Sequence, residues 1–284
     1  MTTTLNPPAV DSFLQRAPTV ADRVTNAGTR RSETVPWDEA VQSSGAWRYE
    51  LKYLVGRESR AGLLHDLAAL SEADRHAGLD GSYRVRTLYL DSPDAACYHD
   101  KIDGVPDRFR LRVRGYFVGD RLVSTVKFEI KERRGERMRK HVVAVPEEGY
   151  RELSSVLRSF RFPRNEWLHL PVLARFFRLK QVQAFRPVLV VEYVRRAFLP
   201  RTHSGCRITF DETLEAWSAT ELLHRKSSGG GLLRPYRGIF EIKTPGTIPA
   251  WVAELIRKYR LGRQAASKYA MAAESLGIAA DGDL

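Results

Sequence analysis

The sequence predicts an α+β protein in which antiparallel strands form a closed β-barrel that is flanked by helices. From Trp47 onward, short segments that alternate between polar and apolar residues recur along the chain, with turn signals between them. Several of these segments place charged residues on one face and aliphatic or aromatic residues on the other. Few helical segments are inserted among them, which is the pattern of an α+β domain whose sheet closes on itself.

Eight segments are predicted to be strands because their side chains alternate with a period of two. They are Arg48–Val55, Tyr83–Leu90, Arg108–Phe117, Ser124–Lys131, Met138–Val145, Pro187–Phe198, Cys206–Leu214 and Arg237–Lys243. Turn signals follow three of them: Asp91-Ser-Pro, Gly119-Asp120 and the polar turn that contains Gly135.

Six further segments have the apolar spacing of helices. They are Glu58–Leu70, Ala95–Lys101, Glu147–Phe160, Glu166–Ala184, Pro249–Arg260 and Gln264–Leu276. Ser227–Gly231 is rich in glycine but lacks the Gly-Lys-Ser/Thr of a phosphate-binding P-loop, so it is predicted to be a linker. Residues 1–45 show no sustained periodicity and are expected to form a disordered tail, which leaves 46–279 as one domain.

The composition favours a protein that binds a polyanion. The chain has 284 residues and a net charge of +12, from 46 basic and 34 acidic residues. Nucleic acid, an anionic membrane and phosphate chains all fit such a surplus. No segment has the roughly 18 apolar residues of a membrane span, and no secretory signal is recognisable. Cys97 and Cys206 lack metal-site spacing; buried thiols are favoured over a disulfide, and a cytoplasmic location is predicted.

The segment Arg108-Phe-Arg-Leu-Arg-Val-Arg114 is the most informative one in the chain. Alternation places Arg108, Arg110, Arg112 and Arg114 on one strand face, where they repel one another unless water or an anion neutralises them. Arginine suits phosphate because its planar guanidinium donates two parallel hydrogen bonds and stays charged. A solvated outer face of a sheet is the alternative interpretation.

Other strands carry the same kind of charged face, which favours an inward-facing arrangement over a solvated one. Members of these faces are Glu50, Lys52, Lys127, Glu129, Lys131, Arg207, Thr209, Asp211, Arg237, Glu241 and Lys243. If helices cover the apolar outer face of the barrel, these charges line its interior. Cations that hold phosphoryl oxygens and carboxylates that hold a divalent ion are what a metal–polyphosphate complex needs.

Eight motifs in order resemble the VTC domain, the polyphosphate polymerase domain of the vacuolar transporter chaperone family, within the CYTH-like triphosphate tunnel metalloenzyme superfamily. They are R-Y-E-L-K-Y, T-L-Y-L-D-S-P-D with Y-H-D-K-I-D-G, R-F-R-L-R-V-R-G-Y, F-E-I-K-E-R, R-R-A-F, R-I-T-F-D, F-E-I-K-T and A-S-K-Y. The resemblance runs from about Arg48 to Leu276 and is closest to stand-alone bacterial members. It implies a tunnel-shaped barrel that transfers the γ-phosphate of ATP to a growing polyphosphate chain with a divalent metal, Mn²⁺ or Mg²⁺.

Site residues follow from this resemblance and from the charged strand faces. The catalytic candidates are Lys52, Arg112, Arg114, Lys131, Arg207 and Lys268. The phosphate-binding candidates are Lys101, Arg110, Lys127, Arg139, Lys140, Arg195, Arg196 and Lys243, in which Arg139 and Lys140, and likewise Arg195 and Arg196, are alternatives for one role. Glu241 is the metal candidate, followed by Glu50 and Glu129. One departure from the family is Ala265, where a second lysine is expected; Arg263 is the candidate substitute.

Two other functions fit the same residues. One is a tripolyphosphatase or nucleoside triphosphatase, in which water replaces the acceptor chain. The other is a polyphosphate-binding protein without catalysis. Nucleic acid is disfavoured because the sequence shows neither a recognition helix nor aromatic residues placed for base stacking. The expected partners are therefore ATP and inorganic polyphosphate, and any coupling to a membrane would require a separate partner protein.

Overall fold

A computed structural model describes residues 40–74, 78, 80–201, 205–225, 230–232 and 238–278. Contacts divide the chain into Met1–Thr34 and Val35–Leu284, and all of the described residues belong to the second unit. Residues 1–39 of the expected tail and Arg237 of the expected last strand lie outside the described residues.

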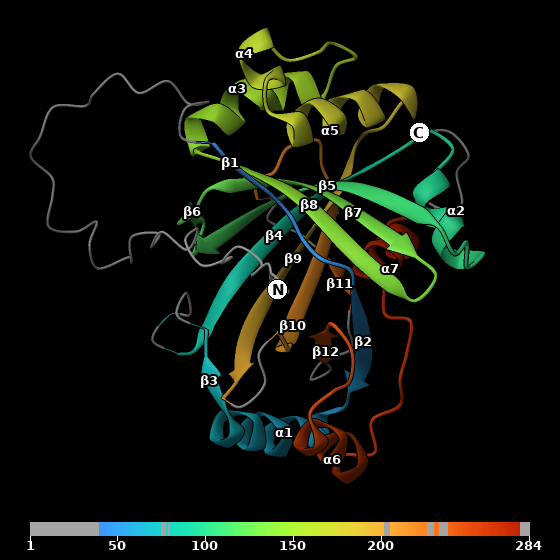
Figure 1. Cartoon of the computed structure of the whole chain (residues 1–284). Coiled ribbons are helices and arrows are strands. Elements are labelled where there is room, and N and C mark those ends of the chain that lie inside the picture. The colour runs from blue at the N-terminus through green and yellow to red at the C-terminus, as the bar shows by residue number, and fades with distance from the viewer. Residues whose placement is uncertain are drawn as a thin grey trace, which may run out of the picture. The chain divides into compact units, whose positions relative to one another are not determined.

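Eight antiparallel strands close into a barrel, as the sequence predicts (Figure 1). In order around the barrel they are β2 (Arg48–Val55), β8 (Arg137–Val145), β7 (Val126–Arg134), β5 (Arg108–Val118), β4 (Ser82–Asp91), β9 (Arg186–Pro200), β10 (Arg207–Ser218) and β12 (Gly238–Thr244). The ring closes because β10 pairs with both β9 and β12, and β2 pairs with both β12 and β8.

The contact between β2 and β8 is the seam of the barrel. These strands pair only at Arg48 and Tyr49, and the rest of the β8 edge pairs with β1 (Val41–Ser44). Residues 41–44 were expected to belong to the disordered tail, and the structure corrects that expectation with an ordered strand. Beyond the seam, the free edge of β2 is met by the segment before the last helix, where the Gln264 amide donates to the Lys52 carbonyl at 2.9 Å.

Three short strands were not expected from the sequence. β3 (Ser71–Ala73) extends the sheet beside β9, and β6 (Arg121–Leu122) pairs with the end of β5. β11 (Gly230–Gly231) pairs with β10 in the segment expected to be a linker, of which residues 227–229 lie outside the described residues. Each is too short for period-two alternation to be recognised.

Helices cover the barrel on two opposite sides (Figure 1). On one side lie α3 (Glu147–Leu157), α4 (Asn165–Leu168) and α5 (Pro171–Val182), and on the other lie α1 (Arg57–Leu70) and α6 (Ala250–Lys258). The expected helix 166–184 is divided before Pro171, because proline lacks the N–H that a continuing helix needs and suits a first turn.

The two remaining helices, α2 (Ala96–Ile102) and α7 (Lys268–Ser275), contact each other at one mouth of the barrel. The expected last helix starts at Lys268 rather than at Gln264, since Ser267 caps it by accepting a hydrogen bond from the Ala270 amide. Residues 264–267 are consequently not helical. No helix in the described part of the chain is both long and apolar enough to cross a bilayer.

The apolar faces of the strands point outward to the helices. Phe128 and Ile130 belong to a buried cluster with residues of α3 and α5, and Ile208 and Phe210 belong to a second cluster with residues of α1 and α6. Side chains alternate along a strand, so burying these residues on the outside forces the charged residues between them to face inward. The core therefore lies between barrel and helices, and the lumen remains polar.

Gly238 provides a test of this packing. A Cβ atom at this position would lie 2.2 Å from Cζ of Phe210, whose ring rests on the β12 backbone. We expect Gly238→Ala to lower the free energy of unfolding by about 2 kcal/mol, because the ring and the sheet must move apart. Urea denaturation measures the effect. Gly246→Ala is the control, since nothing lies within 4 Å of its Cβ position, and equal stability losses in both variants would contradict the packing argument.

Candidate active site

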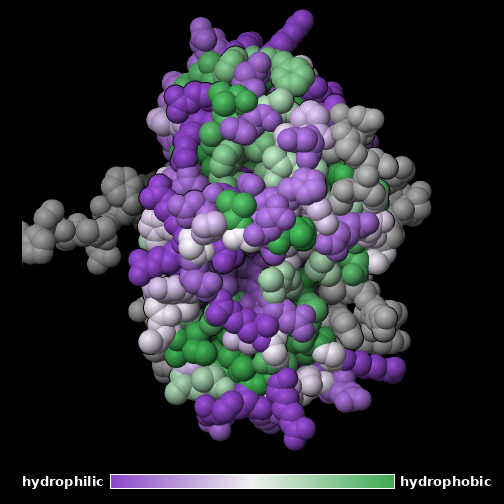
Figure 2. Space-filling view, turned by 90° about the vertical axis from the view of Figure 1, so that its right-hand side faces the viewer, coloured by the Kyte–Doolittle hydropathy of each residue, from purple (hydrophilic) through white to green (hydrophobic). Residues whose placement is uncertain are grey.

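A cavity of about 450 Å³ lies inside the barrel, and its hydrophilic interior is visible as a hollow in Figure 2. Strands β2, β4, β5, β7, β8, β9 and β12 contribute to its lining, together with α2 and residues 263–269. The lining cations are Arg48, Lys52, Lys101, Arg108, Arg110, Arg112, Arg114, Lys131, Arg133, Arg139, Lys140, Arg195, Lys243, Arg263 and Lys268. The lining carboxylates are Glu50, Glu132, Glu136 and Glu241, so basic residues are in large excess.

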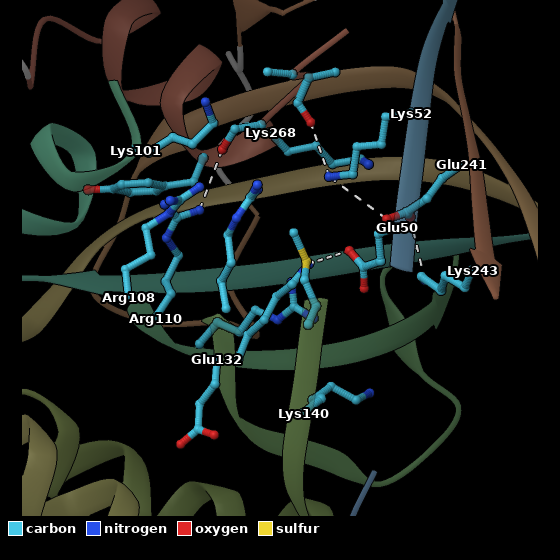
Figure 3. A pocket seen from close by; sticks show the side chains of 18 of the residues that line it. Glu50, Lys52, Lys101, Arg108, Arg110, Glu132, Lys140, Glu241, Lys243 and Lys268 are labelled. Atoms are coloured by element: carbon cyan, nitrogen blue, oxygen red, sulfur yellow. Dashed lines mark hydrogen bonds and ion pairs between the residues drawn. The ribbon is translucent and has the colours of Figure 1, made fainter. Parts of the chain in front are cut away.

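The four arginines of β5 all line this cavity, so the alternative of a solvated outer face is wrong. Figure 3 shows Arg108 and Arg110 side by side on their strand. Arg110 donates to the Cys97 carbonyl at 3.1 Å, and its guanidinium lies 4.5 Å from the centre of the Tyr269 ring. Helices α2 and α7 therefore hold the outer part of the row in place.

Glu129 is the counter-ion of the inner arginines. Its carboxylate accepts from Arg112 at 2.5 Å and from Lys140 at 2.8 Å, and Arg114 lies 3.8 Å away. Burial alone would raise the pKa of Glu129, but these three cations hold it well below the usual value. Both carboxylate oxygens are engaged, so Glu129 is better suited to holding the arginines in place than to binding a metal.

Glu50 makes a comparable but simpler pair with Lys131, at 2.6 Å. Burial raises the pKa of Glu50, yet Lys131 and the other nearby lysines lower it to about 2. Burial also lowers the pKa of Lys131 to about 8, even though Glu50 opposes that shift. Glu50 therefore remains ionised at neutral pH and keeps most of the Lys131 population protonated.

Glu241 is held differently from the other two carboxylates. Lys243, Lys52 and Arg195 surround it at 3.4, 3.8 and 3.8 Å, and no described residue donates a hydrogen bond to it. Burial raises its pKa, but the surrounding lysines lower it well below the usual value. Its oxygens are ionised and only loosely engaged, and Figure 3 shows the side chain among Glu50, Lys52 and Lys243.

Lys268 reaches the lumen from the first turn of α7. Its amine lies 2.7 Å from Asp211, which also accepts two hydrogen bonds from Arg195 at 2.6 and 2.7 Å. Burial opposes ionisation of Asp211, but Arg195 and Lys268 lower its pKa to about 2. Sequence reasoning did not select Asp211 as a site residue, although its alternation with Arg207 and Thr209 placed it on the inward face.

The segment before α7 closes one side of the cavity. Lys52 donates to the Ala266 carbonyl at 3.1 Å, and Ala265 lies in the lining where the family can carry a second lysine. Arg263, the expected substitute, lies at the rim and donates to Glu136 at 2.7 Å. Its side chain is 56% exposed, so it is placed to meet an anion at the entrance rather than deep in the lumen.

Lys101 and the β8 residues complete the lining. Lys101 extends from α2 toward the arginine row (Figure 3), and Lys140 pairs with Glu129. Arg139 donates twice to Glu132, at 3.0 and 2.6 Å, and its guanidinium lies 4.6 Å from the Trp47 ring. Both members of this pair of alternatives line the cavity, but only Lys140 is linked to the arginine row.

Four expected site residues are not part of the cavity lining: Glu129, Lys127, Arg196 and Arg207. Arg196 occupies the opposite face of β9 from Arg195 and pairs with Glu212, so Arg195 fills the inward position. Lys127 lies 4.7 Å from the centre of the Tyr116 ring, and Arg207 pairs with Asp74.

Three further residues lie outside the lumen. Arg86 is fully buried on the outer face of β4 and donates to Glu192 at 2.8 Å. Cys97 and Cys206 are both buried free thiols, which confirms the favoured expectation.

Asp91 ties the helices of the mouth to the barrel. Its carboxylate accepts from the Ser92 and Cys97 amides at 2.8 Å, from the Tyr98 amide at 3.2 Å and from the Tyr269 hydroxyl. The turn predicted at Asp91-Ser-Pro is confirmed, and Asp91 also holds the start of α2. The link to Tyr269 adds that it also positions α7, and hence Lys268.

Fold and site together define a closed antiparallel barrel with a cation-rich lumen that also holds ionised carboxylates. The chain belongs to the VTC domain family, whose family model matches residues 47–277. Both the resemblance drawn from the motifs and the predicted fold are confirmed.

Solved structures add distant similarities of fold. A "putative adenylate cyclase" from Bacillus halodurans has a TM-score of 0.47 at 13% identity, covering 78% of this chain and 93% of its own. A "putative adenylyl cyclase" from Hippeastrum, described as having a dominant triphosphatase activity, has a TM-score of 0.43 at 15% identity and covers 81% and 96%. A search of curated proteins found no match.

Tyr116 offers a spectroscopic test of the lumen's electrostatics. Burial raises the pKa of its phenol, but Lys127 and Arg114 lower it to about 8. We expect a tyrosinate absorbance step near this pH, since the neighbouring cations favour the deprotonated form. Tyr116→Phe should remove the step, and Lys127→Met should move it toward the ordinary value of about 10. A step that remains in Tyr116→Phe would assign the titration to another tyrosine.

Asp91 offers a test of how the mouth is positioned. We expect Asp91→Ala to lower the free energy of unfolding by about 3 kcal/mol, because it leaves buried amides without an acceptor. It should also weaken tripolyphosphate binding, since Lys268 and Lys101 lose their support. Calorimetric titration measures the binding, and exposed Asp103 in the C-cap of α2 provides the control as Asp103→Ala. Unchanged binding in a folded Asp91→Ala protein would contradict the positioning role.

Proposed function

We propose that this protein is a polyphosphate polymerase, which transfers the terminal phosphoryl group of ATP to the end of an inorganic polyphosphate chain. The observation that carries the proposal is the cavity with its surplus of buried cations around ionised carboxylates. Such a surplus is electrostatically unfavourable when the lumen is empty and becomes favourable when a polyanion enters. Membership of the VTC domain family supports the same substrate class.

Two pairs of cations are placed to hold a phosphate chain. Arg112 and Arg114 have their Nε atoms fixed by Glu129 and Thr87, which orients the remaining guanidinium donors. Lys268 and Arg195 also reach the lumen and share Asp211 as their anchor. A phosphoryl group held between these two pairs of cations would have positive charge around its equatorial oxygens.

The reaction needs no nucleophilic side chain. An oxygen of the acceptor's terminal phosphate forms a bond to the γ-phosphorus while the bond from that phosphorus to the β–γ bridging oxygen breaks, so that ADP leaves with the electron pair. The described residues lining the cavity include no histidine or cysteine. Alignment of the two phosphates and neutralisation of their charge then supply the acceleration.

A divalent ion fits beside Glu241, provided that the phosphate chain brings the other ligands. No group of three or more His, Cys, Asp or Glu residues in the described ranges could hold a metal unaided. Glu241 is ionised and loosely held, and Mg²⁺-type sites commonly combine one carboxylate with substrate phosphates. When bound, Mn²⁺ or Mg²⁺ would neutralise charge on the bridging and terminal phosphate oxygens.

Hydrolysis of tripolyphosphate or of a nucleoside triphosphate is the second candidate. The rim of the cavity is open to solvent, since the side chains of Arg263 and Glu136 are 56% and 59% exposed. Water can therefore reach the position of the acceptor, and the same cations would stabilise its attack. The polymerase proposal requires in addition that a second phosphate chain occupies this entrance.

The proposed compartment is the cytoplasm, with ATP and polyphosphate as small-molecule partners. The free, buried state of Cys97 and Cys206 supports a reducing environment. If polyphosphate made here crosses a membrane, the proposal assigns that step to a separate partner protein.

The deciding experiment incubates purified full-length protein with Mn²⁺ and ATP and measures long-chain polyphosphate and free phosphate together. Polymer with matching ADP supports the polymerase, and phosphate without polymer supports the hydrolase. If neither product forms although polyphosphate binds, the protein is a binder and the catalytic proposal fails.

Glu241→Gln tests the assignment of the metal carboxylate. We expect kcat/KM to fall by about a hundredfold, because the metal loses its one protein carboxylate. Glu241→Gln should still bind tripolyphosphate without metal, because the substitution removes a negative charge from the lumen. The gain in affinity on adding Mn²⁺ should disappear. Glu192→Gln, a buried carboxylate on the outer face of the barrel, controls for lost ion pairs. An unchanged Mn²⁺ effect in Glu241→Gln would remove Glu241 from the metal site.

A further inference from the structure

Inward-facing side chains continue along β4 and β5 beyond the point where the cavity ends. The lining stops at Arg114, Tyr193 and Arg195. The next inward positions, by alternation and by pairing in the sheet, are Val85 opposite Tyr116 and Tyr83 opposite Arg195. The lumen is thus occupied by side chains where the strands alone would let it continue.

Two tyrosine rings form the main part of this obstruction. The rings of Tyr83 and Tyr116 lie 5.7 Å apart between centres and are tilted by 58°. Tyr83 is 8% exposed and Val85 is fully buried, so neither faces open solvent. Tyr193, which is 1% exposed, lies on the cavity side of these rings, beneath Arg195 and Lys268.

Two cations lie against these rings and outside the cavity lining. Lys127 lies 4.7 Å from the Tyr116 ring centre, and Arg207 donates to the Tyr83 hydroxyl at 3.4 Å. Lys127 shares the inward face of β7 with the lining residue Lys131. Arg207 shares the inward face of β10 with Asp211, which pairs with the lining residues Arg195 and Lys268. Lys127 and Arg207 therefore face inward and contact the tyrosines, but they are not part of the cavity lining.

We propose that Tyr83 and Tyr116 form a closing layer that limits the length of phosphate chain the cavity holds; this inference rests on the proposed action on polyphosphate. With the layer in place, a chain enters only from the rim beside Arg263 and ends against Arg114 and Arg195. The site then takes short oligophosphates and chain ends. Lys127 and Arg207 contact phosphate only when the rings move aside.

Chain-length dependence of binding tests the proposal without requiring catalysis. Metal-free full-length protein is titrated with tripolyphosphate and with long-chain polyphosphate at one salt concentration, and affinities are expressed per chain. Tyr116→Val removes one ring and places a residue that favours strands, and Tyr116→Phe keeps the ring as the matched control. Lys127→Gln is made both as a single variant and together with Tyr116→Val. Melting temperatures confirm that each variant is folded.

We expect Tyr116→Val to bind long chains about tenfold more tightly while tripolyphosphate affinity stays within about twofold, since each new charged contact contributes at least that much. Tyr116→Phe should match the wild type. Lys127→Gln should have no effect alone and should cancel the gain in Tyr116→Val. If Tyr116→Val does not fold, Tyr83→Val, which removes the partner ring, is expected to give the same gain.

Two results would overturn the closing layer: an unchanged ratio of long-chain to tripolyphosphate affinity in the valine variants, or a loss of long-chain affinity in Lys127→Gln alone. The second result would mean that the chain already passes the rings. Failure of the proposed function gives a different outcome. If both ligands bind with the expected length dependence but ATP yields neither polymer nor phosphate, the polymerase proposal fails and the closing layer stands.

Discussion

The structure depends on keeping many like charges ionised inside a barrel. Removing arginine and lysine from water is costly, and each neighbour of the same sign adds to that cost. Glu129, Glu50, Glu241 and Asp211 offset part of it, and their pKa values are all lowered as a result. The offset is incomplete: burial lowers the pKa of Lys243 to about 7, although Glu241 opposes the shift. A polyanion supplies the missing negative charge, so the substrate completes the electrostatics of the lumen.

The fold tolerates this arrangement because its hydrophobic core is elsewhere. Helices on two sides bury the outer apolar faces of the strands, and two separate clusters provide the stabilisation that a polar lumen does not. The carboxylates also differ in how closely their neighbouring cations hold them. Glu129 holds Arg112 and Lys140 with short hydrogen bonds, whereas Glu241 is loosely surrounded. Tight pairs fix the walls of the site, and the loose carboxylate remains available to a ligand.

The sequence predicted the barrel because eight strands show strong alternation, and it predicted the charged lumen because cations recur on one face of several strands. It did not reveal β1, whose Val-Gln-Ser-Ser lacks an apolar pattern and is held by its pairing with β8. Two adjacent arginines, Arg195 and Arg196, could be separated only by knowing which of them faces inward. Lys127 and Arg207 share the inward faces, as expected, but they contact Tyr116 and Tyr83 and are not part of the cavity lining. Asp211 gained its role from Lys268, a partner that no local pattern could identify.

The hydrogen bond from Lys52 to the Ala266 carbonyl joins residues 214 positions apart in the chain. Lys268 follows directly after that contact, and its amine crosses to Asp211. A ribosome has therefore translated nearly the whole domain before the two walls of the site can meet. A nascent chain that contains only β4, β5, β7 and β8 therefore still lacks the part of the cavity that residues 263–269 supply.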